Sequence, residues 1–132
     1  MTLHVGLDTF RPVAAARLEE HELHGERYGV ATPAWERIAA AERVLAVGTT
    51  TVRVLETVAG GGPLDGRTSL FVVPGFRFRR VDALLTNFHL PRSTLLALVM
   101  AFAGVEETRR LYRVAVEERY RFYSFGDAML IL

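Results

Sequence analysis

The sequence predicts an α/β fold, a layered sheet with flanking helices. Two observations favour it. Short apolar segments with strand character alternate along the chain with helix-like segments, and glycine or proline residues separate the two kinds. The length of 132 residues, with 50% hydrophobic and 23% charged residues, suits a single globular domain or part of one.

The first elements are two expected strands with a helix between them. Residues 3–5 predict a short strand, and the Phe10-Arg11-Pro12 segment ends it because proline cannot donate to a strand ladder. Residues 13–23 predict a short, charged helix. Residues 26–31 predict a second strand.

A helix start follows at Thr32-Pro33. A threonine hydroxyl can cap a helix, and proline is favoured at the first helical position. We therefore expect Thr32 to cap a helix that runs to about Glu42. Residues 44–47 form an apolar strand that stops at Gly48.

The middle of the chain predicts one helix and two strands. Residues 49–59 form the helix, which the Gly60-Gly61-Gly62-Pro63 segment closes. Residues 68–73 are expected to form a buried strand that Pro74-Gly75 ends, and residues 81–86 form another strand.

Two helices and a strand complete the expected fold. Ser93 can cap a helix over residues 94–103 that is apolar on all sides and therefore buried between layers. Gly104 separates it from an amphipathic helix over residues 106–118, and residues 128–132 form a last strand. Opposite charges four residues apart stabilise such a helix. The expected pairs are Glu106–Arg110 and Arg113–Glu117.

The expected strands at both ends of the chain predict an incomplete sheet. The chain starts and stops within strands, and unpaired sheet edges favour pairing with further polypeptide. The sheet is therefore expected to need more chain than these residues supply.

Composition excludes several classes of function. The absence of cysteine excludes disulfides, thiolate catalysis and cysteine-based metal sites. The longest apolar run, residues 95–103, is shorter than the roughly 20 residues of a membrane span. No secretory leader follows Met1, so a cytoplasmic protein is expected. The net charge of +1 indicates no global attraction to nucleic acid, although every cation is arginine, which suits phosphate recognition or reflects a coding bias.

The clearest candidate site is the Ala46-Val47-Gly48-Thr49-Thr50-Thr51-Val52-Arg53 segment. A strand leads into a glycine turn and then a helix whose first turn carries three hydroxyls and is followed by an arginine. Free backbone N–H groups and the helix dipole favour an anionic or hydroxyl-rich ligand there. An ordinary threonine-capped helix is the alternative.

The His21-Glu22-Leu23-His24-Gly25-Glu26 segment is a second candidate. Its spacing permits a metal site if a third ligand lies nearby, but it lacks the spacing of a zinc-binding helix. A general base or hydrogen-bonding role for His24 or Glu26 is another interpretation, and a solvated helix end is a third.

Two further segments carry grouped polar or aromatic residues. Residues 86–94 gather Asn87, His89, an arginine and a serine between a strand and a buried helix, which suits directed hydrogen bonds or a plain loop and cap. Residues 119–127 and 76–80 interleave aromatics with arginine. Such segments stack bases and bind phosphates, or form strands with one aromatic and one cationic face.

Taken together and in order, the segments resemble the C-terminal part of the S-adenosylmethionine:tRNA ribosyltransferase-isomerase family of queuosine biosynthesis. The combination of Thr-Asn-Phe-His-Leu-Pro with Phe-Gly-Asp-Ala-Met is specific to that family. The matching stretches are Leu3 to Gly6, Thr9 to Val13, Glu20-His21 with His24 and Glu26, Ala46 to Arg53 with Leu55-Glu56, Pro74 to Phe76, Val81 to Pro91, Ser93 to Leu95, Ala101 to Gly104, Ala115 to Glu118, Tyr120 to Phe122 and Gly126 to Met129.

The resemblance implies a Rossmann-like layered sheet with flanking helices, incomplete without the family's upstream portion. Residues 1–132 would be the C-terminal portion of the α/β domain, and the family's β-barrel domain is absent from these residues. The expected partners are tRNA and the missing upstream part or a second chain, with no membrane. Asp8, Gly25 and Val73 depart from the family, which usually has Gly, Ser and Tyr there.

The resemblance also implies a reaction. S-adenosylmethionine (AdoMet) gives its ribosyl group to the amine of 7-aminomethyl-7-deazaguanine in tRNA, and epoxyqueuosine forms as adenine and methionine leave. AdoMet is a substrate, and no metal is required. The alternatives are a non-catalytic nucleotide- or AdoMet-binding module and a small His/Glu metal hydrolase.

The residue roles are expectations from the same resemblance. His24 or Glu26 is the candidate base, and His89 and Asp127 complete the expected catalytic set. The expected AdoMet- or substrate-binding residues are Gly48, Thr49, Thr50, Arg53, Asn87 and His4, and the expected tRNA contacts are Arg77, Arg79 and Arg80.

Overall fold

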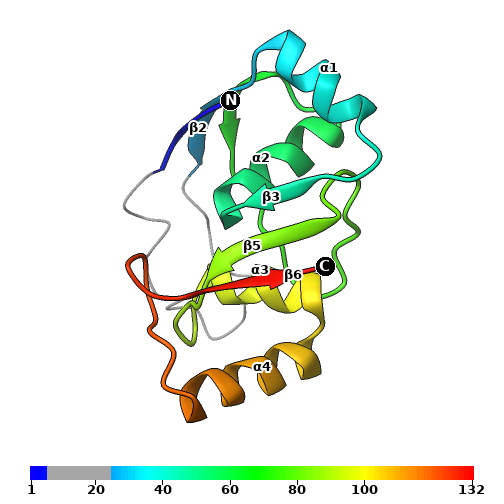
Figure 1. Cartoon of the computed structure of the whole chain (residues 1–132). Coiled ribbons are helices and arrows are strands. Elements are labelled where there is room, and N and C mark those ends of the chain that lie inside the picture. Colours follow the sequence, from blue (N-terminus) through cyan, green and yellow to red (C-terminus); the bar gives the residue numbers. More distant parts are fainter. Residues whose placement is uncertain (6–24) are drawn as a thin grey trace.

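The computed structural model describes residues 1–5 and 25–132, and its helices and strands confirm the α/β class (Figure 1). The expected helix over residues 13–23 lies outside the described residues. The elements in chain order are β1 (Thr2–His4), β2 (Glu26–Gly29), α1 (Thr32–Ala40), β3 (Leu45–Val47), α2 (Thr49–Ala59), β4 (Asp65–Thr68), β5 (Ala83–Asn87), α3 (Thr94–Ala103), α4 (Val105–Glu117) and β6 (Ala128–Ile131).

The strands form two small sheets. In the first, β2 lies between β1 and β4 and pairs antiparallel with both. In the second, β5 lies in the centre, parallel to β3 and antiparallel to β6. The parallel pairing of β3 with β5 agrees with the strand–helix alternation of the sequence, because parallel strands need a long crossover connection between them.

Helix α2 is the central element, since it packs between the two sheets. Val52 and Leu55 belong to the core cluster that also contains Ala46 of β3 and Leu84 of β5. Val54 belongs to a second cluster that contains Tyr28 of β2 and Val30 just after it. Contact on both sides explains why eight of its eleven residues are buried, Arg53 and Glu56 included.

The chain after β5 builds the opposite end of the molecule. Ser93 caps α3 by accepting a hydrogen bond from the Leu96 N–H at 3.1 Å, as expected. No residue of α3 is exposed, which confirms the expectation of a buried helix. Helix α4 packs beside α3 and lies farthest from α1 (Figure 1).

Three expectations are wrong in detail. The strand expected over residues 68–73 is instead Asp65–Thr68, because these four residues pair with β2. Residues 69–73 pair with no strand, although Val72 among them is buried. The cap of α1 is Ala31, and Thr32 is its first helical residue. The ion pairs of α4 are Glu106–Arg109 and Glu107–Arg110, three residues apart, with both pairs exposed.

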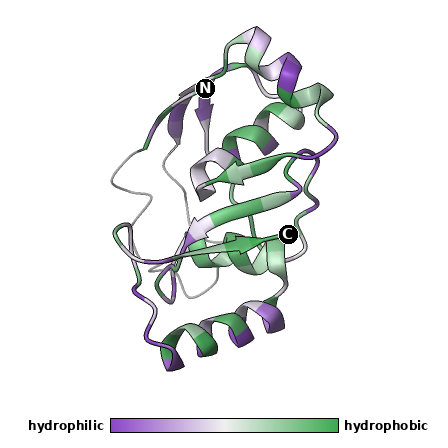
Figure 2. Cartoon of the chain, viewed as in Figure 1, coloured by the Kyte–Doolittle hydropathy of each residue, from purple (hydrophilic) through white to green (hydrophobic). Residues whose placement is uncertain are grey.

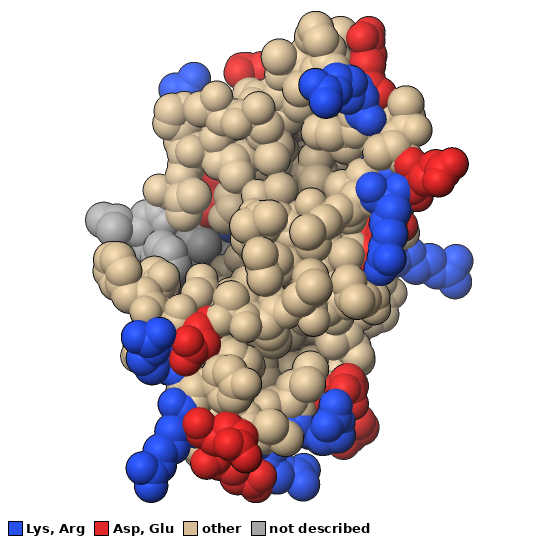
Figure 3. Space-filling model, viewed as in Figure 1, with Lys and Arg blue, Asp and Glu red and all other residues tan. Residues whose placement is uncertain are grey.

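One face of the β3–β5–β6 sheet is not covered by any described element. Leu45 and Val47 of β3 are 50% and 60% exposed, and Leu130 of β6 is 54% exposed. These strands are hydrophobic in Figure 2, and the centre of the same view carries no charged residue in Figure 3. We call Leu45, Val47 and Leu130 the open sheet face. Among the described helices, none has the length and apolar character needed to cross a bilayer.

Candidate functional site

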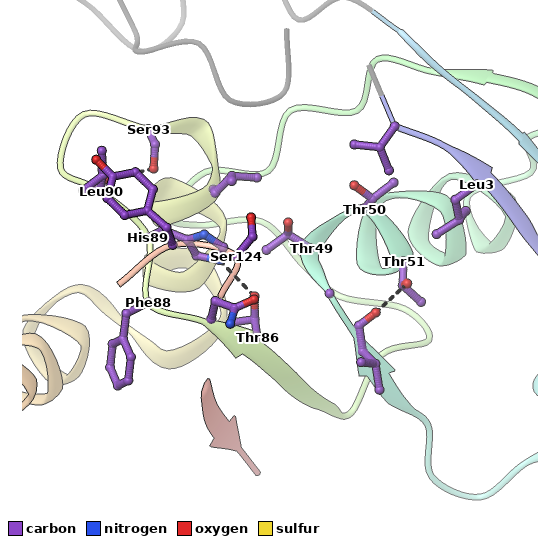
Figure 4. Close-up of a pocket in the computed structure, with 16 residues that line it drawn as sticks. Leu3, Thr49, Thr50, Thr51, Thr86, Phe88, His89, Leu90, Ser93 and Ser124 are labelled. Atoms are coloured by element: carbon purple, nitrogen blue, oxygen red, sulfur yellow. Dashed lines mark hydrogen bonds between the residues drawn. The ribbon is translucent and has the colours of Figure 1, made fainter. Parts of the chain in front are cut away.

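A cavity of about 350 Å³ lies at the carboxyl ends of the parallel strands β3 and β5 (Figure 4). In open α/β sheets this is the usual position of a ligand crevice. Three segments that are distant in sequence contribute most of its wall. The described lining residues are Leu3, Val5, Val47 to Thr51, Thr86 to Leu90, Ser93, Leu95, Tyr123 and Ser124.

The first wall is the turn from β3 into α2. Gly48 has φ +86° and ψ 147°, a conformation that only glycine adopts readily, and its N–H donates to the Leu85 carbonyl at 2.8 Å. This turn brings the start of α2 to the cavity, and the first N–H groups of a helix lack partners within it. The Thr51 hydroxyl donates to the Val47 carbonyl at 2.7 Å.

The second wall is the end of β5 and the loop after it. Nε2 of His89 lies 2.9 Å from Oγ1 of Thr86, and both side chains face the cavity (Figure 4). Phe88 points away, and its ring packs edge-on against Tyr112 of α4 with centroids 5.5 Å apart. Burial lowers the pKa of His89 to about 4, so the imidazole is neutral at pH 7.

The third wall is the loop between α4 and β6. The Tyr123 N–H donates to the Phe88 carbonyl at 3.1 Å, which joins this loop to the second wall. The side-chain amide of Asn87 donates to the carbonyls of Gly126 and Asp127, at 3.5 and 3.3 Å. The geometry of this loop thus depends on an amide that also borders the cavity.

The described lining carries no Asp, Glu, Lys or Arg. Because His89 is neutral as well, the wall offers hydroxyls, one amide, one imidazole and the start of a helix, together with apolar surface. Such a wall suits a ligand with several hydrogen-bonding groups. The α2 N-terminus adds a preference for a negative group at that end.

Comparison with known proteins identifies the family of this fold and cavity. A model of the family described as queuosine biosynthesis protein matches residues 1–131. The chain belongs to this queuosine biosynthesis family. It is 61% identical over 132 residues to S-adenosylmethionine:tRNA ribosyltransferase-isomerase of Rubrobacter xylanophilus, and 58% identical over 138 residues to that of Moorella thermoacetica.

A solved member of the queuosine biosynthesis family has the same fold. The crystal structure of S-adenosylmethionine tRNA ribosyltransferase from Thermotoga maritima matches with a TM-score of 0.77 and 54% identity, over 81% of this chain and 40% of that one. The two curated relatives are matched over 100% and 98% of this chain but 40% of their own length. The matched portion is their C-terminal part.

The structure brings together five of the residues expected to bind AdoMet or substrate, or to catalyse. Gly48, Thr49, Thr50, Asn87 and His89 all line the cavity, from two of its walls. Three residues that were not among the expected site residues also line it: Thr86, Tyr123 and Ser124. Tyr123 has a positive φ of 72°, which no local sequence signal announces.

Four other expected residues do not line the cavity. Arg53 is 3% exposed and pairs with Glu26, which is 2% exposed. The carboxylate of Asp127 accepts the Arg121 N–H at 2.7 Å and faces its guanidinium, which lowers the Asp127 pKa. His4 is exposed on β1. His24 lies outside the described residues, so its expected role stays a prediction.

The expected tRNA contacts lie on a loop, not on a strand with two faces. Phe76 and Phe78 pack into the core, while Arg77 and Arg79 are exposed. The Arg80 guanidinium donates to the Ala41 carbonyl. Glu56, a buried residue of α2, anchors this loop. Its carboxylate accepts hydrogen bonds from the backbone N–H groups of Arg79, Arg80 and Val81 at 2.7, 3.0 and 2.9 Å.

Residues 119–127, for which a strand with an aromatic and a cationic face was one interpretation, also form a loop. Its aromatic residues contact the second wall, since the Phe122 ring lies 5.5 Å from that of Phe88. Within the described ranges, no group of three or more His, Asp or Glu side chains is arranged to hold a metal ion.

Proposed function

We propose that residues 1–132 are the C-terminal portion of the α/β domain of an AdoMet:tRNA ribosyltransferase-isomerase, and that the cavity binds AdoMet as the ribosyl donor. The observation that carries the proposal is the meeting of the three walls at the ends of β3 and β5. The names of the relatives, at 61% and 58% identity, support the reaction.

The proposed reaction transfers and isomerises the ribosyl group of AdoMet. The amine of 7-aminomethyl-7-deazaguanine in tRNA receives this group, adenine and methionine leave, and epoxyqueuosine forms. The ribose protons beside the sulfonium are acidic, so a base must lie near them. Departing adenine needs a hydrogen-bond donor, and the methionine carboxylate needs donors of its own.

The cavity offers hydrogen-bonding groups to the carboxylate and to ribose or adenine. The N-terminal turn of α2 at Gly48 to Thr50 offers N–H groups and a favourable dipole to the carboxylate. Asn87 and neutral His89 offer directed hydrogen bonds to ribose or adenine. A neutral imidazole both donates and accepts, and its contact with Thr86 uses one ring nitrogen and leaves the other for the ligand.

The tRNA is proposed to lie along the loop that Glu56 anchors. Arg77 and Arg79 are exposed there, and arginine binds phosphate through paired donors. Arg80, which was expected to contact tRNA with them, is half-buried, and its guanidinium donates to the Ala41 carbonyl. Its proposed role is therefore to stabilise the loop and not to bind tRNA. A tRNA substrate implies action in the cytoplasm.

The upstream portion that the relatives carry is proposed to cover the open sheet face. Leu45, Val47 and Leu130 are exposed and apolar, and a stable fold buries such a surface against further polypeptide. The centre of Figure 3 carries no charged residue. This chain spans 40% of the relatives' length, so ample chain is available for that role.

A chimera tests the proposal: this chain replaces the matching C-terminal part of the Rubrobacter xylanophilus relative. We expect the chimera to release adenine from AdoMet in the presence of precursor tRNA and to form epoxyqueuosine. The unmodified relative is the positive control. A folded chimera that binds AdoMet but releases no adenine would instead support a non-catalytic binding module.

A further inference from the structure

Glu26, Arg53 and Thr50 form a buried group behind the cavity wall. The Glu26 carboxylate in β2 pairs with the Arg53 guanidinium in α2, and the two residues are 2% and 3% exposed. The Thr50 hydroxyl lies 3.4 Å from the other Glu26 oxygen. Only Thr50, of these three residues, lines the cavity.

This arrangement bears on the choice of the base. A general base must lie within hydrogen-bonding distance of the proton that it removes, directly or through one water. The two Glu26 carboxylate oxygens face Arg53 and Thr50, and the residue does not border the cavity. Thr50 therefore stands between the Glu26 carboxylate and the cavity.

The same contacts determine how α2 presents its first turn. Arg53 and Thr50 are three residues apart and so share one face of the helix. Glu26 contacts both, which ties β2 to the start of α2 and limits its rotation about the helix axis. A hydroxyl has one proton, so Thr50 donates it to Glu26 and offers only lone pairs to the cavity.

We propose that Glu26 is a positioning residue, which holds Arg53 and Thr50 so that Thr50 accepts a hydrogen bond from a hydroxyl or amine donor of the bound nucleoside. This inference rests on the proposed function. It removes Glu26 from proton abstraction and assigns it to substrate binding through Thr50.

The test compares Glu26→Gln, Thr50→Val and Thr50→Ser in the chimera. A positioning role predicts that Glu26→Gln and Thr50→Val raise the KM for AdoMet roughly tenfold, since a site that loses a hydrogen bond binds less tightly. It predicts kcat within about threefold of the parent, because a lost base lowers the rate by a factor on the order of 10² or more. Thr50→Ser restores the KM because it keeps the hydroxyl.

Two further measurements complete the design. The double variant Glu26→Gln/Thr50→Val should raise the KM no more than either single change, because both act through one hydroxyl. Glu107→Gln, which removes an exposed carboxylate paired with Arg110, is the matched control and should leave the KM unchanged. Thr50→Val keeps the Glu26–Arg53 pair, so it reports on the hydroxyl even where Glu26→Gln does not fold.

The outcomes separate the two proposals. A parent chimera without adenine release overturns the proposed function and this inference together. An active parent whose Glu26→Gln variant loses kcat, with an altered acid limb of the pH profile and an unchanged KM, overturns this inference alone. A Thr50→Val variant with an unchanged KM does the same.

Discussion

The hydroxyl oxygen of Tyr112 accepts a hydrogen bond from the backbone N–H of His89 across 2.9 Å. Tyr112 belongs to α4, which contributes no residue to the cavity wall, and yet it holds the loop that carries His89. Burial raises the pKa of Tyr112 to about 12, so the hydroxyl keeps its proton at neutral pH.

Tyr112→Phe should loosen that loop. The change leaves the ring in place but deprives the His89 N–H of its acceptor, which costs about 1 kcal/mol of unfolding free energy. Urea unfolding of the chain measures this loss, and AdoMet affinity of the chimera should fall with it. Tyr120→Phe is the control, because the Tyr120 ring also contacts Phe88 but its residue is 47% exposed. Equal effects of the two changes would contradict the role given to the Tyr112 hydroxyl.

His89 should make stability depend on pH below neutrality. Its folded pKa of about 4 lies below the ordinary value of 6.5, so the unfolded chain binds the proton more readily between these values. Stability is therefore complete above the unfolded pKa and falls as the pH drops through it, by about 1 kcal/mol between about pH 7 and pH 5.5. Thermal unfolding at about pH 7 and pH 5.5 measures this loss of stability for the chain and for the His89→Gln variant. The part of the loss that His89 causes should be absent from the variant. Parallel pH curves for both proteins would refute it.

Gly48→Ala should weaken ligand binding beyond its effect on stability. Alanine at a φ of +86° and a ψ of 147° is strained, although the space beside Gly48 is open. Strain of this kind costs about 1–3 kcal/mol. Gly104→Ala is the matched control, with φ 88° and ψ 149° at the N-cap of α4. Both variants should lose similar unfolding free energy, and only Gly48→Ala should reduce the AdoMet affinity of the chimera.

Glu56→Gln should destabilise the chain strongly. Glu56 is 3% exposed and its carboxylate accepts three backbone N–H groups of residues 79–81. An amide leaves at least one of these donors facing an N–H group, and we expect a loss of about 3 kcal/mol. Urea unfolding measures it, with Glu107→Gln as the exposed control, for which a change of no more than about 0.5 kcal/mol is expected. A similar small change for Glu56→Gln would contradict the anchoring role.

The open sheet face should make the isolated chain self-associate. Val47 and Leu130 are exposed on edge strands, and an apolar face of this kind associates in water. Val47→Glu with Leu130→Glu should shift the chain towards the monomer in sedimentation velocity. Val116→Glu, at a residue 66% exposed on α4, should leave association unchanged. In the chimera, the double change should reduce soluble yield, because the same face is proposed to be buried there.

Much of the fold is predictable from local signals. The bounds of α2 and α3 agree with the expectation because a glycine precedes the first and Ser93 caps the second. Local signals fail for the strand expected over residues 68–73, since strand formation depends on which partner offers a ladder. They also do not reveal that the strands divide into two sheets with α2 between them.

The candidate site is predictable to a similar extent. The glycine turn and the segment around His89 each follow a strand, and the ends of parallel strands meet at one edge, which favours their proximity. The third wall is different. Tyr123 and Ser124 reach the cavity because the loop bonds to Phe88 and Asn87 across more than thirty residues, and no local pattern encodes such contacts.

The sequence by itself determines the α/β class, the family and the segments that carry chemistry, because these depend on residue type and spacing along the chain. Only the tertiary structure decides which side chains reach the ligand. Arg53 and Asp127 look equally suited to binding in the sequence, yet Arg53 is buried against Glu26 and Asp127 is turned to Arg121. The physical reason is that a charged side chain goes to the opposite charge that the fold brings near, and that partner is set by contacts between distant segments.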